Sequence, residues 1–189
     1  MKQFKKSFTL IETIVVVAVI GLTLPIIFSI FFVLLQQQTK VFRLNAVKKE
    51  GDYIVNLIDN TVRDRAVTIL SSTSPIPPTT NKVCFDDLNP FYSASNLYFL
   101  DKDGIWFGYE QNSDTLASAS AGQTSINLTS PKIRVSSFSI SCSRTNVYSQ
   151  PSISLSFNID YCADVACSQT RPEEIASLHY QTRIKLRNY

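Results

Sequence analysis

The sequence contains few of the residues that enzymes use for chemistry. Its 189 residues include one histidine, one tryptophan, one methionine and five glycines. It has no glycine-rich phosphate loop, no GxSxG turn for a nucleophilic serine and no HExxH zinc motif. The single histidine, His179, stands beside Tyr180 in an expected strand, where histidines are more often packed or solvated than catalytic. We therefore predict that the chain is not an enzyme and uses no cofactor.

Paired carboxylates and metal-binding clusters are also missing from the sequence. Asp86–Asp87 and Glu173–Glu174 are adjacent pairs whose side chains would diverge on a strand, so they do not form a general acid–base pair. The DKDG segment at 101–104 resembles the start of a calcium loop, but no acidic residue follows at the required spacing. We expect a tight turn there, and no metal site.

The four cysteines are an even set without a CxxC pair. Four cysteines allow three pairings. We favour Cys162 with Cys167, which closes the short segment CADVAC, and Cys84 with Cys142. This pairing requires an oxidising compartment. A zinc site and reduced, buried cysteines are the alternatives.

Charged residues are absent from Ile14 to Leu35. This run of about 22 residues gives about 33 Å of helix, enough to cross a hydrocarbon core of about 30 Å. The run is longer than the apolar part of a secretory signal peptide. Pro25 lies inside it and is expected to bend or loosen the helix. Glu12 stands just before the uncharged run, where a carboxylate needs either a partner or a place among the lipid headgroups.

The order of residues around Glu12 resembles a known targeting signal. A short basic segment, MKQFKKS, is followed by FTLIE and then by the apolar run. This resembles the class III signal of type IV pilins, pseudopilins and related competence proteins. The resemblance implies that a prepilin peptidase cuts between Ser7 and Phe8 and methylates the new amino terminus at Phe8. The family usually has glycine before the cut, whereas this chain has Ser7.

The resemblance also assigns a role to Glu12. After cleavage, Glu12 would follow the new terminus at Phe8 by one helical turn, within reach of the terminal amine of a neighbouring subunit. A carboxylate and an ammonium group that are buried together offset part of each other's desolvation cost. We therefore expect Glu12 to act in assembly. The partners that the resemblance implies are prepilin peptidase, other pilin or pseudopilin subunits, an inner-membrane assembly platform and the lipid bilayer.

The net charge gives no indication of a nucleic-acid partner. The formal charge is +3, and the leader lysines Lys2, Lys5 and Lys6 account for all of it. Without residues 1–7 the chain is formally neutral. We therefore predict no nucleic-acid partner for this subunit.

The rest of the chain predicts an α+β fold. Residues 36–70 are expected to continue the membrane helix (8–35) as an amphipathic helix, with an apolar face that consists of Leu44, Val47, Ile54, Leu57, Ile58 and Val62. Gly51 lies on or near that face and would permit close approach of another backbone. After the proline-rich segment SSTSPIPPTTN, residues 71–189 change to a period of two and predict a β-rich head of antiparallel strands.

Four segments of the head are expected to be strands, in addition to a hairpin with its turn at 101–104: SINLT, FSISC, SISLSFNIDYC and LHYQTRIKLRN. In the third, Ile153, Leu155, Phe157, Ile159 and Tyr161 should face one way and the polar residues the other. The segment SDTLASASAGQTS is expected to be a polar loop. The predicted architecture is a long N-terminal helix packed on an antiparallel sheet, as in pilins.

The function that these features favour is structural. We expect a subunit, of the minor kind, of a type IV pilus or of a pseudopilus like that of type II secretion. Such a subunit is stored in the inner membrane as a single-pass protein with an extracytoplasmic head, and it assembles into a filament after processing. The alternative is an extracytoplasmic binding or adhesion module held by a signal anchor that is never cut.

Overall fold

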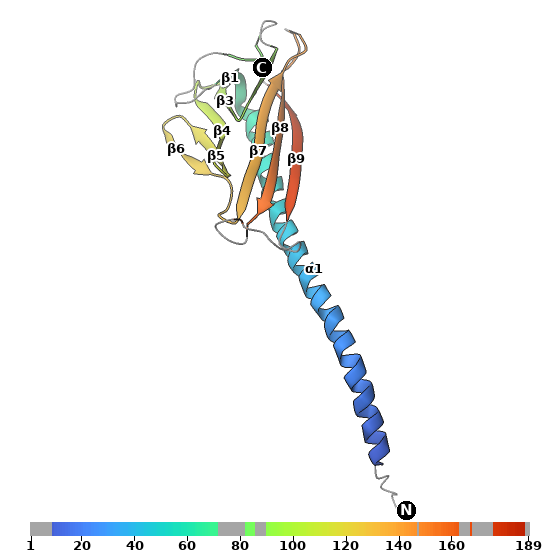
Figure 1. Ribbon diagram of the computed structural model, residues 1–189. Helices are drawn as coiled ribbons and strands as arrows, with labels where there is room; N and C mark the ends of the chain where they lie inside the picture. Colours follow the sequence, from blue (N-terminus) through green and yellow to red (C-terminus); the bar gives the residue numbers. More distant parts are fainter. Residues whose placement is uncertain are drawn as a thin grey trace, which may run out of the picture.

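The protein consists of one long helix and two antiparallel sheets (Figure 1). The computed structural model describes residues 9–71, 82–85, 90–146, 148–162, 167 and 176–187. The sheets form a head at the C-terminal end of the helix, and the N-terminal half of the helix projects away from it. The predicted α+β architecture, a long helix packed on an antiparallel β head, is confirmed.

Helix α1 spans Leu10–Arg65 and is assigned without a break through Pro25. We expected the helix to reach residue 70, but it ends at Arg65. The next residues form strand β1, Ala66–Leu70, which pairs antiparallel with β3. The sequence of β1, AVTIL, contains three β-branched residues, which favour an extended backbone. Pairing with β3 therefore takes precedence over continuation of the helix.

The first sheet has four strands in the order β2-β7-β8-β9. Their bounds are Phe91–Ala94 for β2, Ile133–Ser143 for β7, Ser152–Tyr161 for β8 and Ser177–Lys185 for β9. The predicted alternation in β8 is confirmed, because Ile153, Leu155, Phe157 and Ile159 are fully buried. Tyr161 is half-buried. The inner face of this sheet packs on α1, mainly through β8 and β9.

The second sheet has five strands in the order β1-β3-β4-β5-β6. The bounds of the others are Asn96–Asp101 for β3, Trp106–Asn112 for β4, Thr115–Ser120 for β5 and Gln123–Asn127 for β6. The predicted hairpin is confirmed as β3 and β4. The predicted polar loop at SDTLASASAGQTS is wrong, since β5 and β6 form a second hairpin there. The side chains in this segment are small, so its sequence does not show the alternation of apolar and polar residues that predicts a strand. Leu116, Ala117 and Ala119 are nevertheless buried.

A single large core fills the space between the two sheets and α1. The helix contributes Val47, Gly51, Ile54, Ile58 and Val62, all of which are buried. These are four of the six predicted apolar-face residues together with the predicted glycine. Leu44 and Leu57 are only partly buried. The C-terminal half of α1, residues 43–65, is therefore an integral part of the head.

We expected Gly51 to permit close approach of another backbone, but in the structure an aromatic ring approaches it. A Cβ atom at position 51 would overlap the ring of Tyr180 on β9. The hydroxyl group of Tyr180 lies 3.0 Å from the carbonyl oxygen of Lys48 and 3.1 Å from Asp52 Oδ1. The ring stacks on Phe157, with centroids 5.4 Å apart. Tyr180 thus fixes the position of the helix on the sheet.

Candidate assembly segment of the helix

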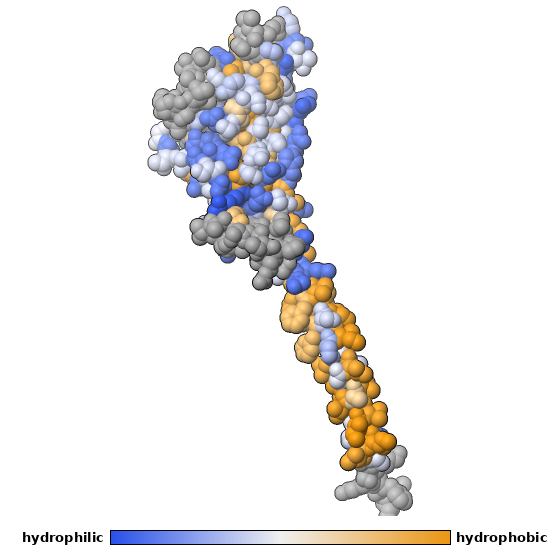
Figure 2. Space-filling model, in the orientation of Figure 1, coloured by the Kyte–Doolittle hydropathy of each residue, from blue (hydrophilic) through white to orange (hydrophobic). Residues whose placement is uncertain are grey.

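The N-terminal part of α1 is not covered by the other described residues. Residues 10–42, which we call the stalk, are all exposed, although most of them are large and apolar. Figure 2 shows the stalk as a mostly hydrophobic rod that leaves a head of mixed polarity. From Leu10 to Leu35 the helix is about 39 Å long. By length and composition it can cross a membrane.

The apolar residues of the stalk surround the whole helix and do not form a single stripe. Exposed side chains of Val15, Val16, Val17 and Val19 point in successive directions around the axis. A helix that is apolar all round is suited to complete burial, either in lipid or among other helices. The stalk is thus adapted to both environments, whereas residues 43–65 are adapted to one sheet.

Hydroxyl groups of the stalk are satisfied within the helix. Thr13, Ser29 and Thr39 donate to backbone carbonyl oxygens three or four residues earlier at 2.8–3.0 Å, and Thr23 does so at 3.3 Å. These bonds remove the cost of transferring a free hydroxyl group to an apolar medium. These four hydroxyl residues are therefore compatible with burial in hydrocarbon.

Glu12 is the acidic side chain of the stalk. It lies in the first turn of α1, where its backbone N–H donates to Thr9 at 3.1 Å. The side chain is exposed, and its carboxylate has no hydrogen-bond or ion-pair partner among the described residues. A carboxylate near a helix N-terminus interacts favourably with the helix dipole. The predicted processing residues Ser7 and Phe8 lie outside the described residues.

Pro25 lies midway along the stalk. A proline has no backbone N–H, so the carbonyl oxygen of Gly21 loses its usual helical partner. The helix assignment is nevertheless continuous there, and a Cβ atom at Gly21 would meet nothing within 4 Å. The predicted bend or local loosening at Pro25 stays a prediction.

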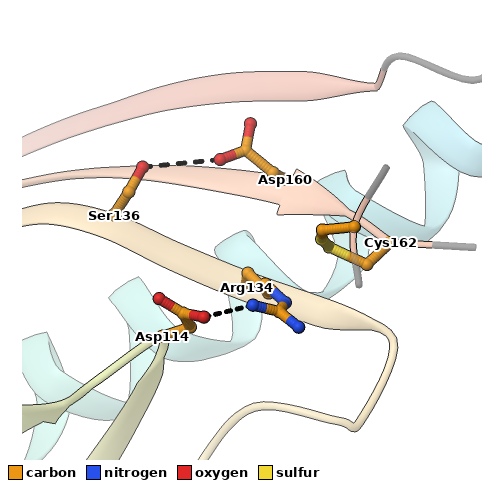
Figure 3. The surroundings of a disulfide bond; sticks show 6 residues. Asp114, Arg134, Ser136, Asp160 and Cys162 are labelled. Atoms are coloured by element: carbon orange, nitrogen blue, oxygen red, sulfur yellow. Dashed lines mark hydrogen bonds and ion pairs between the residues drawn. A yellow bond between two sulfur atoms is a disulfide. The ribbon is translucent and has the colours of Figure 1, made fainter. Parts of the chain in front are cut away.

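Both cysteine pairs favoured from the sequence are joined in the structure. Cys84 and Cys142 have Cα atoms 6.2 Å apart, and Cys162 and Cys167 have Cα atoms 4.8 Å apart. The first bridge is fully buried and ties the segment before β2 to β7. The second lies at the end of β8 (Figure 3). None of the described cysteines is free.

The surroundings of the second bridge show how the two sheets are joined. Arg134 on β7 forms an ion pair with Asp114, which lies between β4 and β5 of the other sheet. On the outer side of β7, Ser136 Oγ donates to Asp160 at 3.4 Å. The ion pair joins β7 to the five-stranded sheet, and the hydrogen bond joins β7 to β8 within the four-stranded sheet.

The DKDG segment forms the predicted turn. One carboxylate oxygen of Asp101 accepts from the backbone N–H groups of Asp103 and Ile105 at 2.9 and 3.0 Å. The other accepts from Arg65 at 3.0 Å. The hydrogen bond from Arg65, followed by that from Ile105, lowers the pKa of Asp101. Among the described residues, no group of three histidine, cysteine or acidic side chains could hold a metal ion.

No protein-family model, curated protein or solved structure matches the chain. The site therefore rests on its own geometry: an uncovered apolar stalk with one unpartnered carboxylate near its end. The sequence indicated both features. It did not indicate Tyr180, the residue that fixes the C-terminal half of α1 on the sheet, because no local pattern specifies which strand will lie over Gly51.

Proposed function

We propose that the chain is a structural subunit, of the minor kind, of a type IV pilus or a secretion pseudopilus. It is stored in the inner membrane and enters a filament after prepilin peptidase removes residues 1–7. The observation that carries this proposal is the stalk, which is apolar on all sides and continues directly into a helix that is integral to the head. The FTLIE signal at its start supports the same function.

Storage and assembly place the same stalk in two environments. In the membrane, lipid chains cover its side chains, and the head remains outside the bilayer. In the filament, stalks of other subunits replace the lipid. Because both environments are apolar, the exchange costs little hydrophobic free energy, and specific contacts can determine it.

Glu12 supplies such a contact in this proposal. Its carboxylate has no partner within the described part of the chain, and Glu12 follows Phe8 by four residues in the sequence. In a filament it would pair with the methylated amine at Phe8 of a neighbouring subunit. Breaking a buried pair by removal of one partner costs about 3–5 kcal/mol, so this contact would favour correctly placed subunits.

A second candidate function is an extracytoplasmic binding or adhesion module on an uncut anchor. The observation that favours it is Ser7, which stands where the family usually has glycine. In that case the stalk would serve only as an anchor. Glu12 would then lie at headgroup level with no assembly role.

Cleavage of the leader distinguishes the two functions. Co-expression with an active prepilin peptidase should shorten the chain by its first seven residues and methylate Phe8, as measured by intact mass and N-terminal sequencing. Ser7→Gly should speed the cut. A peptidase with an inactivated active site is the control. Retention of Lys5 and Lys6 after exposure to active peptidase would instead support the uncut anchor.

A further inference from the structure

Four cationic side chains line one hollow in the head. The C-terminal ends of α1 and β9, beside which it lies, are at the end of the head farthest from the stalk (Figure 1). The hollow has a volume of about 380 Å³ and lies beside the last turn of α1 and the end of β9. The lining residues are Arg63, Gln150, Arg183, Lys185, Leu186 and Arg187. No carboxylate is among them.

Ion pairs at the helix neutralise only part of this charge. Arg63 Nη2 lies 2.8 Å from Asp59 Oδ1, and Arg187 Nη1 lies 4.0 Å from Asp64 Oδ1. Both members of the Arg187 pair are largely exposed, so the pair is weak. Arg63 Nε is buried and has no hydrogen-bond partner among the described residues. The helix side of the hollow thus keeps unused donor capacity.

The positive charges on the strand side of the hollow are neutralised even less than those on the helix side. Lys185 has no hydrogen-bond or ion-pair partner among the described residues. Arg183 donates from Nε to Ser154 Oγ at 3.4 Å and forms no ion pair within the part of the chain that the structure describes. The hollow is therefore an electropositive site although the chain without its leader is formally neutral.

Two rows of side chains lead from the hollow across the outer face of the four-stranded sheet. Strand register places Lys185, Ser152, Ser143 and Phe91 in one row and Arg183, Ser154, Ser141 and Ser93 in the other. The Oγ atoms of Ser143 and Ser152 lie 3.1 Å apart, which places them on the same face. Because neighbouring strands lie about 4.8 Å apart, each row is about 14 Å long. We call the two rows and the hollow the polar strip.

We propose that the polar strip binds an acidic polysaccharide. Arginine and lysine at one end would pair with carboxylate or sulfate groups. Serine hydroxyl groups in the middle can donate and accept, as the hydroxyl groups of a sugar require. Phe91 at the other end is 64% exposed and offers an apolar ring for the face of a sugar. This site does not depend on filament assembly and would also function on an uncut anchor.

The position of the strip excludes the headgroups of the protein's own membrane as the anion. Arg63 lies about 42 Å along the helix axis from Leu35, the end of the uncharged run. Electrostatic attraction is largely screened beyond about 10 Å at physiological salt. The end of the head nearest the stalk carries three exposed lysines, Lys48, Lys49 and Lys132, against the carboxylates of Glu50 and Asp52, so a second copy stacked end to end would not offer a net negative surface.

The distribution of charge favours a polysaccharide over a nucleic acid. A nucleic-acid strand carries a charge at every nucleotide, whereas the middle of the strip has only neutral hydroxyl groups. A strand laid along the strip would therefore place phosphates over Ser143 and Ser152 without a cation. Single-strand binders also use several aromatic platforms, and these two rows contain one.

Binding of the full chain in detergent micelles to alginate, a polymer of uronic acids, tests the proposal. We expect binding that weakens as salt rises, and no binding of neutral dextran of similar length. Arg183→Ser with Lys185→Ser should weaken alginate binding about tenfold or more, because two charge contacts are lost. Lys102→Ser with Lys132→Ser removes the same charge from exposed positions outside the strip and should change binding less than twofold.

A second variant tests the aromatic end of the strip. Phe91→Ser should weaken alginate binding severalfold and leave its salt dependence unchanged, because no charge is removed. Thermal unfolding of each variant shows that the head is intact. The proposal is overturned if the unaltered chain does not bind alginate, if dextran binds equally well, if both double variants weaken binding equally, or if a single-stranded oligothymidylate binds more tightly than alginate.

Discussion

At position 51, the absence of a side chain determines how the helix lies on the sheet. The ring of Tyr180 occupies the space that a Cβ atom would need, and its hydroxyl group bonds to the helix on both sides of Gly51. The glycine was noticeable in the sequence because it interrupts an otherwise good amphipathic helix. Its partner could not be predicted, since Tyr180 lies far away in the sequence and the pairing depends on the whole fold.

Replacement of Gly51 by alanine should destabilise the head. Alanine favours the helix by about 1 kcal/mol over glycine, but overlap with Tyr180 should cost more than that, with a net loss of about 1–3 kcal/mol. Gly21→Ala is the matched control, because a Cβ atom there meets nothing within 4 Å. Thermal unfolding of the full chain in detergent measures both. An alanine at position 51 that left the unfolding temperature unchanged would mean that the ring is not held against the helix.

Because of the hydroxyl group of Tyr180, the stability of the head should depend on pH in the alkaline range. Burial, and then the hydrogen bond to Asp52, raise the pKa of Tyr180 to about 12. The unfolded value is about 10, so the folded state favours the protonated form. The contribution of this hydroxyl group to folding stability is therefore complete below about pH 10 and is lost as the pH rises toward 12.

Tyr180→Phe measures that contribution. The variant should be less stable by about 0.5–1.5 kcal/mol at neutral pH, because a hydrogen bond is lost. The difference in unfolding free energy between the two proteins should shrink above about pH 10. Denaturant unfolding at a series of pH values gives this difference. A constant difference through the alkaline range would contradict the assigned hydrogen bonds.

The elements of the fold were predictable where side chains alternate strongly in size and polarity. Strand β8 shows this, since Ile153, Leu155, Phe157 and Ile159 all face the core. Strand β5 was missed because its serine and alanine side chains mark neither face clearly, whereas β6 was predicted in part, by the segment SINLT. The predicted end of α1 was too late in the sequence. The helix ends at Arg65 because the next residues form β1, which pairs with β3, and the sequence near residue 66 contains no proline or glycine to stop a helix.

The C-terminal half of α1 should be essential for the head to fold. Its side chains Val47, Ile54, Ile58 and Val62 are fully buried, and each contributes about 1.5–3 kcal/mol as an upper bound. Their sum approaches the whole stability of a typical domain, about 5–15 kcal/mol. A chain that begins at Asn45 should therefore be soluble and unfold cooperatively. A chain that begins at Ala66 should not.

Circular dichroism and thermal unfolding of these two shortened chains provide the test. Both lack the stalk, so they differ only in the helix residues that pack on the sheets. Equal unfolding temperatures would show that the sheets form a core without the helix. The packing described for α1 would then contribute no stability.

The whole molecule combines two parts with different requirements. The apolar stalk needs burial by lipid or by other helices, whereas the head already has a buried core. The membrane-spanning length of the stalk and the position of Glu12 were evident from the sequence. The polar strip was not, because Arg63 comes from the helix, whereas Arg183 and Lys185 come from β9 and Arg187 from just after it. Only the packing of α1 on the sheet brings them together, and the formal charge of the whole chain conceals the cluster.

The most direct test of assembly is the fraction of protein in sheared filaments relative to the membrane, for the unaltered chain, Glu12→Leu and Glu12→Asp. All three should insert and be cut before Phe8. The Leu variant should enter filaments at least tenfold less, because the amine of a neighbouring Phe8 would be buried without a partner at a cost of several kcal/mol. The Asp variant, one methylene shorter, should be intermediate, and Glu50→Leu, which removes a carboxylate outside the stalk, should assemble normally. Normal incorporation of the Leu variant would contradict the assembly role of Glu12.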